Sequence, residues 1–558
     1  MKYSKDDLLF APLGGSGEIG MNVNLYHFRD SWIMVDLGIS FPDESTPGVD
    51  IILPDLKFIA DRREQLAGLV LTHGHEDHFG AIPYLWSLIG CPVYGSAFTL
   101  ALLRRKLSES RVDFDIPLHE IGMNAPFNLG SFEIEMVALN HSIPDPAALA
   151  IRTEAGTILH TGDWKFDKTP VLGRDTDRGR LAAIGDEGVL ALVGDSTNAM
   201  VEGRTGSEND AKEGLIDAIA AATGRVAVTC FASNVARIDS ICRAAIANGR
   251  AIAIVGRALN RTISAAREAG YLSDLPDLVP EGDVDLLPRE SVVVICTGTQ
   301  GEPRAAMARI AAGSHESISL EAGDTVIYSS RQIPGNEKAI ARVQDMLVRR
   351  KIKLVTDQEA PVHVSGHPSR DEMIEMYGLI RPKIAIPVHG TARHLLAHAS
   401  LAKGCQVGQT VLPDNGAMIR LSGDRAEIVD NVHTGVLTSE KGNVIELQAD
   451  MMRVRRRMLW NGAVTVSVVL SQWGTLCAVP SIAQSGLADD GMDSNFIATA
   501  SIAVEDAIDA LGKVARRNDS SVEEVVSQAV RRVARSFFGL RPIAQVHITR
   551  VRAEDLGA

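Results

Sequence analysis

The feature that most constrains this 558-residue chain is a histidine-rich cluster at residues 73–78, which read HGHEDH. An apolar run, 68–72, precedes the cluster, and a small-residue and apolar stretch that fits a helix, 79–89, follows it. A strand that ends in such a loop presents nitrogen and oxygen ligands from one rigid edge, which suits a borderline metal ion such as Zn²⁺. The sequence therefore predicts a metal-binding loop. A merely solvated polar loop is disfavoured, because so dense a cluster is costly to keep without a metal.

The spacing within the cluster argues against a helix and for two metal ions. On a helix, His75 and His78 would share one face. His73 and Asp77 would then point away from that face. We therefore expect a loop that divides its ligands between two adjacent metal ions.

Three further candidate ligands each follow an apolar strand. His141 comes after the alternating run 132–139, Asp163 after 157–162, and His389 after 384–388. In layered α/β proteins, ligands usually lie where buried strands end. Each residue alone would be an ordinary polar residue at a strand end, but together with the histidine-rich loop they complete a dinuclear site.

The order HxHxDH, His, Asp, His resembles the metallo-β-lactamase superfamily, whose fold is an αββα sandwich. Asp36, after the apolar run 32–35, resembles the early structural aspartate of that superfamily. The resemblance implies that one Zn²⁺ is bound by His73, His75 and His141, that a second is bound by Asp77, His78 and His389, and that Asp163 bridges both. Asp36 would orient ligands without binding a metal. Such an imidazole and carboxylate site also accepts Mn²⁺.

More than two hundred residues separate Asp163 from His389, and they carry their own α/β pattern. Strand-like runs lie at 225–231, 251–256 and 291–296, with helix-like segments between them such as 236–248. This pattern predicts a second α/β domain inserted into the first, and it resembles the β-CASP domain of nucleic-acid-processing hydrolases. By this resemblance, Glu208 is the family's acidic first motif, His367 its second and His389 its third. DNA-directed members typically carry valine at the third position, so His389 favours RNA.

Four further segments are similar to the bacterial ribonuclease J family: DSTN at 195–198, FASNVAR at 231–237, TGTQGEP at 297–303 and HVSGH at 363–367. The similarity extends over nearly the whole chain. It implies a zinc-dependent ribonuclease that degrades RNA from 5′ to 3′, prefers single-stranded RNA with a 5′-monophosphate, and also cleaves internally, in RNA processing and decay.

The resemblance also implies roles for individual residues. A hydroxide held near Asp163 would attack the phosphorus, and His367 would protonate the leaving 3′ oxygen. Glu208 would orient His367 and keep it protonated. The residues implied to bind the 5′-phosphate and adjacent nucleotides are Ser233, Asn234, His363, Val364, Ser365, Gly366 and His367.

The domain organisation follows from these placements. We expect a split αββα catalytic domain at 1–205 and 351–435, the β-CASP insert at 206–350, a polar linker at 436–451 and a small α+β domain at 452–558. The last domain shows strand-like runs at 463–470, 476–482 and 543–551 and a helix-like run at 521–538. It fits either a dimerisation role or an RNA-clamping role. We expect a homodimer or homotetramer that works with partners in RNA decay.

Composition agrees with a globular protein of the cytoplasm. Hydrophobic residues make up 45% and charged residues 23%, both ordinary values. No apolar run reaches membrane-spanning length and the first residues lack a signal-peptide pattern, so we expect no membrane partner. Six scattered cysteines without a CxxC pair fit a reducing compartment.

Charge does not exclude RNA as a substrate. The net charge of −14 discourages indiscriminate nucleic-acid binding, but metals and nearby arginines set the potential of a local cleft. A basic run, RVRRR at 453–457, fits equally an RNA contact and a solvated edge strand or linker.

Four other functions are disfavoured. The segment GSGEIG at 15–20 matches a dinucleotide-binding pattern, but the alternation in 21–28 predicts a strand where that fold requires a helix. A small-molecule hydrolase such as a lactonase or thioesterase would need neither the large insert nor the Glu208 and His367 pair. An inactive RNA-binding scaffold would show degraded metal motifs, and all seven ligands are intact. A DNA nuclease is the nearest rival, opposed mainly by His389.

Overall fold

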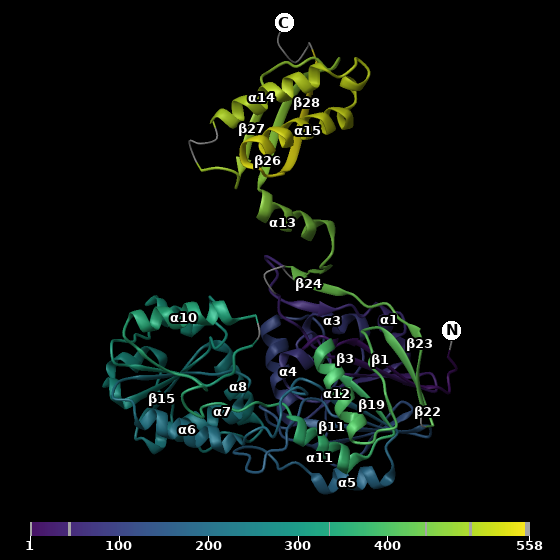
Figure 1. Cartoon of the computed structure of the whole chain (residues 1–558), viewed down its shortest axis with the longest axis vertical. Coiled ribbons are helices and arrows are strands. Elements are labelled where there is room, and N and C mark those ends of the chain that lie inside the picture. The colour runs from purple at the N-terminus through teal and green to yellow at the C-terminus, as the bar shows by residue number, and fades with distance from the viewer. Residues whose placement is uncertain are drawn as a thin grey trace. The chain divides into compact units, whose positions relative to one another are not determined.

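The computed structural model describes residues 3–42, 46–333, 335–423, 425–440, 443–489 and 494–552. The chain divides into two compact units, one formed by residues 1–40 and 52–435 and the other by 41–51 and 436–558. Every predicted site residue lies in the first unit, which holds both parts of the expected catalytic domain and the insert (Figure 1).

One sheet of the sandwich has eight strands, in the order β23-β22-β1-β3-β4-β6-β7-β8. Its strands are β1 (Leu8–Gly14), β3 (Val23–Phe28), β4 (Ser31–Val35), β6 (Leu66–Val70), β7 (Val93–Gly95), β8 (Leu118–Glu120), β22 (Ala417–Ser422) and β23 (Arg425–Asn431). Strand β3 follows the glycine-rich turn directly, so the turn belongs to an antiparallel pair of strands, and the exclusion of a dinucleotide-binding fold holds.

The second sheet has seven strands, in the order β21-β19-β13-β12-β11-β10-β9. These are β9 (Phe127–Leu129), β10 (Phe132–Ala138), β11 (Ala147–Thr153), β12 (Gly156–His160), β13 (Ala191–Asp195), β19 (Ile384–Val388) and β21 (Gln409–Thr410). Apolar side chains from the inner faces of both sheets, among them Phe10, Val35, Ile158 and Ile386, form one core. A short pair, β2 (Ser16–Gly17) with β20 (Gly390–Thr391), joins the glycine-rich turn to the residue after His389.

Helices cover the outer faces of both sheets. On the seven-stranded sheet lie α5 (Arg178–Glu187), α11 (Arg370–Ile380) and α12 (Ala392–Gly404), which bury Leu181, Met376 and Leu401 against it. On the other side lie α1 (Lys57–Ala60), α2 (Glu76–Phe79), α3 (Ile82–Ile89) and α4 (Ala97–Ser110). The order helix, sheet, sheet, helix confirms the predicted αββα sandwich.

The insert is built on a parallel five-stranded sheet, in the order β15-β16-β14-β17-β18. The strands of this sheet are β14 (Val226–Thr229), β15 (Ala251–Val255), β16 (Val292–Cys296), β17 (Thr325–Tyr328) and β18 (Lys353–Val355). The helices of the insert are α6 (Glu208–Ala220), α7 (Val235–Ala247), α8 (Arg257–Glu268), α9 (Ala306–Ala312) and α10 (Glu337–Arg349). Helix α10 lies on one face of the sheet and α6 and α7 lie on the other (Figure 1). Burial on both faces explains the continuous Val and Ile runs. Strand β18 lies beyond the boundary expected at 350, because this short edge strand carries only a weak apolar signal.

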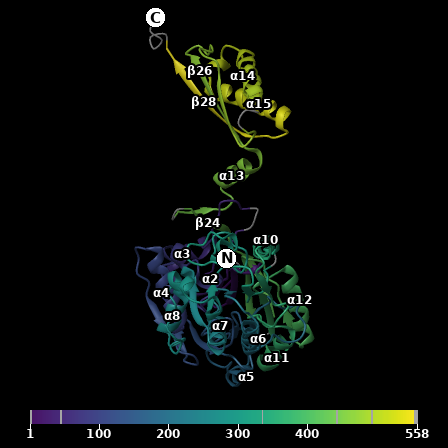
Figure 2. The ribbon, with the colours of Figure 1, turned by 90° about the vertical axis from the view of Figure 1, so that its left-hand side faces the viewer.

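The second unit contains the C-terminal α+β domain. Its elements are β24 (Val436–Glu440), β25 (Asn443–Glu446), α13 (Asp450–Asn461), β26 (Ala463–Ser471), β27 (Ser481–Ser485), α14 (Ser494–Asp509), α15 (Asp519–Phe538) and β28 (Ile543–Val551). Strand β26 lies between β27, to which it is antiparallel, and β28, to which it is parallel. Helices α14 and α15 pack on this sheet through Phe496 and Val530 (Figure 2).

Three expectations for this unit need correction. The expected linker 436–451 contains the paired strands β24 and β25 and the start of α13, because short, half-exposed strands show little alternation. The basic run 453–457 lies inside α13, so it is neither an edge strand nor a linker. Strand β27 begins at Ser481, later than the expected 476, and α14 was not predicted. None of the helices in the described residues combines the length and the apolar composition that a membrane-spanning helix needs.

Candidate metal centre

The histidine-rich cluster is part loop and part helix. His73 and His75 lie in the loop after β6, whereas Asp77 and His78 lie in the four-residue helix α2. The expectation of a loop throughout is therefore wrong for the second half of the cluster. The change from extended to helical backbone at His75 sends the two halves of the motif toward different sets of partners.

The first set of partners contains three imidazoles and one carboxylate, from His73, His75, His141 and Asp163. Nδ1 of His75 lies 3.1 Å from Nε2 of His73 and 3.0 Å from Nε2 of His141. A carboxylate oxygen of Asp163 lies 3.9 Å from the His73 nitrogen and 3.8 Å from the His141 nitrogen. Three nitrogens and one oxygen at this spacing form a donor set that suits Zn²⁺.

The second set of partners contains Asp77, His78, His389 and the same Asp163. The shared carboxylate oxygen of Asp163 lies 3.2 Å from Nε2 of His78 and 3.5 Å from Nε2 of His389. A carboxylate oxygen of Asp77 lies 3.7 Å and 3.8 Å from the same two nitrogens. All seven predicted ligands therefore meet around Asp163, which belongs to both sets.

The second nitrogen of three rings is held by a protein group. Nδ1 of His78 contacts Asp36 at 2.7 Å, Nδ1 of His389 contacts the side-chain oxygen of Asn22 at 2.9 Å, and Nδ1 of His141 contacts the carbonyl oxygen of Gly366 at 2.6 Å. Such contacts fix the ring orientation and leave the other nitrogen for a metal. Asp36 thus lies where the superfamily resemblance expects it, whereas Asn22 was not predicted.

Asp36 is held in place by two further contacts and by a constrained backbone. Its carboxylate accepts hydrogen bonds from the backbone N–H and the hydroxyl of Thr72, both at 2.8 Å. Its φ of 64° lies in the left-handed region, which non-glycine residues seldom adopt. A strained backbone that aims one carboxylate at His78 is typical of a functional site.

Protonation of the ligands fits metal binding. Burial lowers the pKa of His75 to about 4 and holds the pKa of His73 and His141 well below the ordinary value, so all three are neutral near pH 7. Burial also opposes the charged form of His78, but Asp163, Asp77 and Asp36 outweigh it and raise the pKa of His78. A metal bound at Nε2 of His78 would therefore displace a proton.

Asp195 is the partner of His367, and it lies beside the metal centre. A carboxylate oxygen of Asp195 lies 2.8 Å from Nδ1 of His367, and this nitrogen lies 3.9 Å from Asp163. Asp195 ends β13, and it pairs with Val388, the residue before His389. Burial opposes a charged His367, but Asp195 and Asp163 raise its pKa to about 9. These two carboxylates therefore favour the protonated ring, which is the form that a general acid needs.

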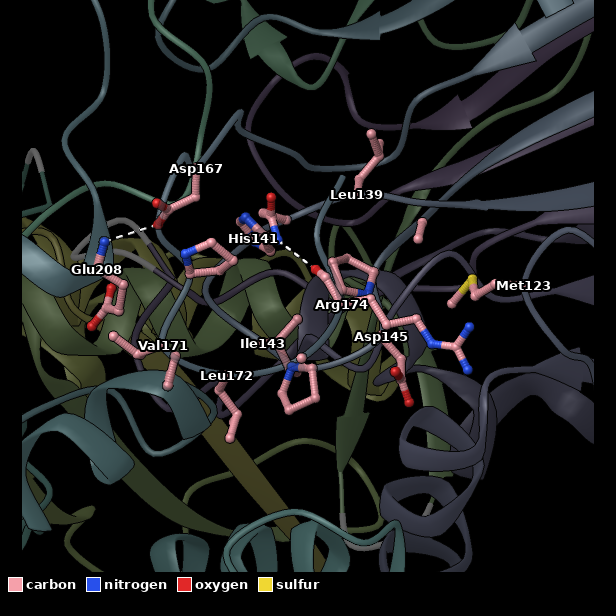
Figure 3. A pocket seen from close by; sticks show the side chains of 17 residues that line it. Met123, Leu139, His141, Ile143, Asp145, Asp167, Val171, Leu172, Arg174 and Glu208 are labelled. Atoms are coloured by element: carbon pink, nitrogen blue, oxygen red, sulfur yellow. Dashed lines mark hydrogen bonds between the residues drawn. The ribbon is translucent and has the colours of Figure 1, made fainter. Parts of the chain in front are cut away.

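The expected contact between Glu208 and His367 is wrong. Glu208 is buried at the start of α6 and accepts hydrogen bonds from Nε and Nη2 of Arg237 at 2.5 and 3.1 Å. Its backbone N–H donates to Asp167 at 2.9 Å. A buried carboxylate needs an opposite charge, and Arg237 supplies it. Figure 3 shows Glu208 beside Asp167, in the wall of a pocket that also adjoins His141.

The turn that carries His367 also presents Ser365 and Gly366. The hydroxyl oxygen of Ser365 accepts hydrogen bonds from the side-chain amide of Asn198 at 2.9 Å and from the backbone N–H of His367 at 3.2 Å. Among the described residues its hydroxyl donates no hydrogen bond, so its hydrogen can be donated to a ligand. A Cβ at position 366 would lie 2.7 Å from the His141 ring, so glycine lets the turn approach this predicted ligand.

The other predicted phosphate-binding residues have different surroundings. Asn234 caps α7 by accepting from the backbone N–H of Arg237 at 2.8 Å, and Ser233 precedes this cap. Val364 packs toward Gly206. Nδ1 of His363 lies 3.1 Å from Nη1 of Arg237. Arg237 thus links the α7 turn to the segment that leads into residues 363–367.

Family models match most of the chain. Residues 32–178 match the beta-lactamase superfamily domain and 223–347 match the ribonuclease J beta-CASP domain. Residues 358–411 match the Zn-dependent metallo-hydrolase RNA specificity domain, and 450–551 match the ribonuclease J C-terminal domain.

Curated relatives match nearly the whole length of the chain. A protein named Ribonuclease J from Sinorhizobium meliloti is 42% identical over 553 residues, which cover 98% of each chain. Another from Mycolicibacterium smegmatis is 43% identical over 82% of each chain. A solved structure described as a protein of unknown function from Enterococcus faecalis V583 has a TM-score of 0.53 and 19% identity over 74% of this chain and 100% of that chain, which shows the fold alone. The chain belongs to the ribonuclease J family.

Proposed function

We propose that this protein is a metal-dependent ribonuclease that uses two Zn²⁺ ions to hydrolyse RNA phosphodiesters. It would act from 5′ to 3′ with a preference for 5′-monophosphate ends, and it would also cleave internally. The observation that carries the proposal is the contact of Asp195 with His367 beside two ligand sets that share Asp163. This arrangement supports an acid that acts next to a site that would bind and polarise a phosphate.

The donor set supports two divalent ions. Two groups of mostly buried side chains that share a carboxylate suit a dinuclear zinc site, and Mn²⁺ also accepts imidazole and carboxylate ligands. When bound, such ions supply Lewis acidity that makes water reactive near neutral pH and stabilises charge on the scissile phosphate. His73, His75 and His141 would hold one ion, Asp77, His78 and His389 the other, and Asp163 both.

His367 would supply the proton that the reaction needs. The leaving 3′ oxygen develops negative charge as its bond to phosphorus breaks, so a protonated imidazole beside it lowers the barrier. Asp195 holds Nδ1 of His367 and favours the charged ring. The ring can then donate from Nε2 and recover its proton from solvent after each cleavage.

The 5′ end of the RNA would bind at the turns around Ser365 and α7. The hydroxyl hydrogen of Ser365 and the side chains of Ser233 and Asn234, in the turn before α7, carry donors that suit a phosphate. A monophosphate held there would set the register for steps of one nucleotide. A triphosphate would bring further charge that a small pocket must desolvate without enough partners.

The cellular setting is part of the same proposal. We expect the protein to act in the cytoplasm, in RNA processing and decay, as a homodimer or homotetramer with partners of an RNA-decay complex. The match of residues 450–551 to a ribonuclease J C-terminal domain supports a shared role for this domain in assembly or RNA binding.

A direct test compares nucleic acids of the same sequence. Purified protein loaded with Zn²⁺ or Mn²⁺ is incubated with 5′-monophosphorylated single-stranded RNA and with the matched DNA, and a metal-stripped sample serves as the control. We expect the RNA to be degraded only by the metal-loaded protein. Preferential cleavage of the DNA would replace this proposal with a DNA nuclease.

A further inference from the structure

Arg237 is a fully buried arginine that joins three segments of the chain. Its Nε and Nη2 hold Glu208 of α6. Its Nη1 lies 3.0 Å from the carbonyl oxygen and 2.9 Å from the hydroxyl oxygen of Ser329, just after β17. The same nitrogen lies 3.1 Å from the carbonyl oxygen of Val362 and 3.1 Å from Nδ1 of His363. Its two hydrogens are therefore shared among four acceptors.

The contact with Arg237 decides which nitrogen of His363 carries the hydrogen. A guanidinium only donates hydrogen bonds, so Nδ1 of His363 must present its lone pair to Arg237. A neutral imidazole with a bare Nδ1 carries its hydrogen on Nε2. Within the described part of the chain, Nε2 of His363 has no hydrogen-bond partner. This N–H is therefore available to a ligand.

The charges around His363 oppose its protonation. Arg237 of α7, Arg331 of the segment after β17 and Lys165 of the segment after β12 all act on the ring as cations. Burial lowers the pKa of His363, and the three cations lower it further, well below its ordinary value. Glu208, the carboxylate on this side, is bound by the other edge of Arg237. No carboxylate is hydrogen-bonded to His363 among the residues that the structure describes.

We propose that Arg237 is a positioning residue for the phosphate site, because it holds His363 in the form that carries hydrogen on Nε2 and so makes it a neutral donor to an RNA phosphate. This inference rests on the proposed function, since that function makes an RNA phosphate the ligand of His363. A neutral donor keeps its hydrogen bond across the working pH range, whereas a histidinium would lose its charge near pH ~6.5.

The form of the ring can be measured without a substrate. In zinc-loaded protein labelled with ¹⁵N-histidine, the NMR signals of the two ring nitrogens show which of them carries the hydrogen. The pair of signals that disappears in His363→Gln belongs to His363. We expect an unprotonated Nδ1 and a protonated Nε2 from about pH 5.5 to 8.5, because the ring stays neutral there. In Arg237→Lys, which keeps the charge but loses the planar fork, we expect mixed tautomers or titration in this range. Arg243→Lys, on the exposed side of the same helix, is the matched control and should leave the His363 signals unchanged.

Kinetics test the role of the donor. Glutamine places an amide N–H near the position of Nε2, whereas asparagine places it near Nδ1. We expect His363→Asn to raise KM for 5′-monophosphorylated RNA by roughly 10- to 100-fold, because a hydrogen bond to a charged phosphate is lost. Its kcat should stay near that of the wild type. His363→Gln should recover most of the affinity, and in both variants the change in KM should be smaller for 5′-hydroxyl RNA, which lacks the terminal phosphate.

Several results would overturn the inference. These are a hydrogen on Nδ1 of His363 in the wild type, titration of His363 near its ordinary pKa, or equal KM values for the Gln and Asn variants. If Arg237→Lys fails to fold, the wild-type spectrum and the two His363 variants still decide the question. If the wild type cleaves no RNA, the proposed function fails, whereas the spectra still test the effect of Arg237 on His363.

Discussion

Asp195 and His367 lie 172 positions apart in the chain, yet a carboxylate oxygen of Asp195 lies 2.8 Å from Nδ1 of His367. The contact joins the end of β13 to the turn that follows the insert, so both parts of the catalytic domain must fold together before it forms. The carboxylate favours the protonated ring and raises the pKa of His367 to about 9, with help from Asp163. The carboxylate that keeps the proposed acid protonated is therefore Asp195, whereas the family resemblance implied Glu208 for this role.

Asp195→Asn should move the alkaline limit of activity to lower pH. A general acid works below its pKa, so activity of the wild type should fall as pH rises toward about 9, or earlier where bound cations lower the pKa of His367. Loss of the Asp195 charge lowers this pKa. The alkaline limb of the pH profile, where kcat falls as pH rises, therefore shifts to lower pH, and kcat at pH 8 falls. The pH profile of kcat measures the shift.

Glu208→Gln is the matched control for that experiment. Because Glu208 contacts Arg237 and not His367, the alkaline limb of the pH profile should stay at the same pH in this variant. The variant should lose thermal stability, because its buried ion pair with Arg237 is broken. A shifted limb in Glu208→Gln with none in Asp195→Asn would contradict the assignment of Asp195.

Much of this site could be predicted from the sequence, because strand ends converge in layered folds. The seven ligands follow apolar strands or fill one dense motif, and the structure brings all of them together. The same rule applies to Asp195, which ends the buried run of β13, but the sequence gives no measure of which strand ends are neighbours. Glu208 matched an acidic motif by type, whereas its partner Arg237 is a long-range contact that no local pattern reveals.

Asp163→Ala should abolish cleavage while the protein stays folded. Asp163 is the only described residue that belongs to all three sets of candidate ligands, so its loss disrupts every metal position. RNA binding should survive better than cleavage, because most phosphate contacts lie outside the metal ligands. Metal content, circular dichroism and single-turnover cleavage are measured on one sample. Turnover near that of the wild type would rule out a two-metal mechanism.

His367→Ala should lower the chemical step by ~10²–10⁴ without changing the metal content. The ring of His367 lies close to Asp163 and His389, and these side chains with Asp195 form a third set that could hold a metal. The number of metal ions bound per chain therefore separates a role of His367 as the general acid from a role as a metal ligand. A loss of one ion per chain in His367→Ala would make His367 a ligand and not the acid.

Removal of residues 450–558 should leave the metal site assembled, because every proposed ligand lies in the other unit of the chain. Activity on long RNA should nevertheless fall if this region holds an oligomer together or steadies the substrate. Sedimentation of the shortened protein separates the two causes, since only the first changes the assembled mass. Unchanged mass together with unchanged activity would remove both roles.

The 5′ end of the RNA tests the central claim most directly. RNAs of one sequence, labelled at the 3′ end and carrying either a 5′-monophosphate or a 5′-triphosphate, are followed for release of mononucleotides. Because the donors around Ser365 and α7 suit one phosphate group, we expect processive degradation of the monophosphate and resistance of the triphosphate to exonucleolytic attack, with internal cleavage less affected. Equal rates of mononucleotide release from both RNAs would contradict a site that reads the 5′ end.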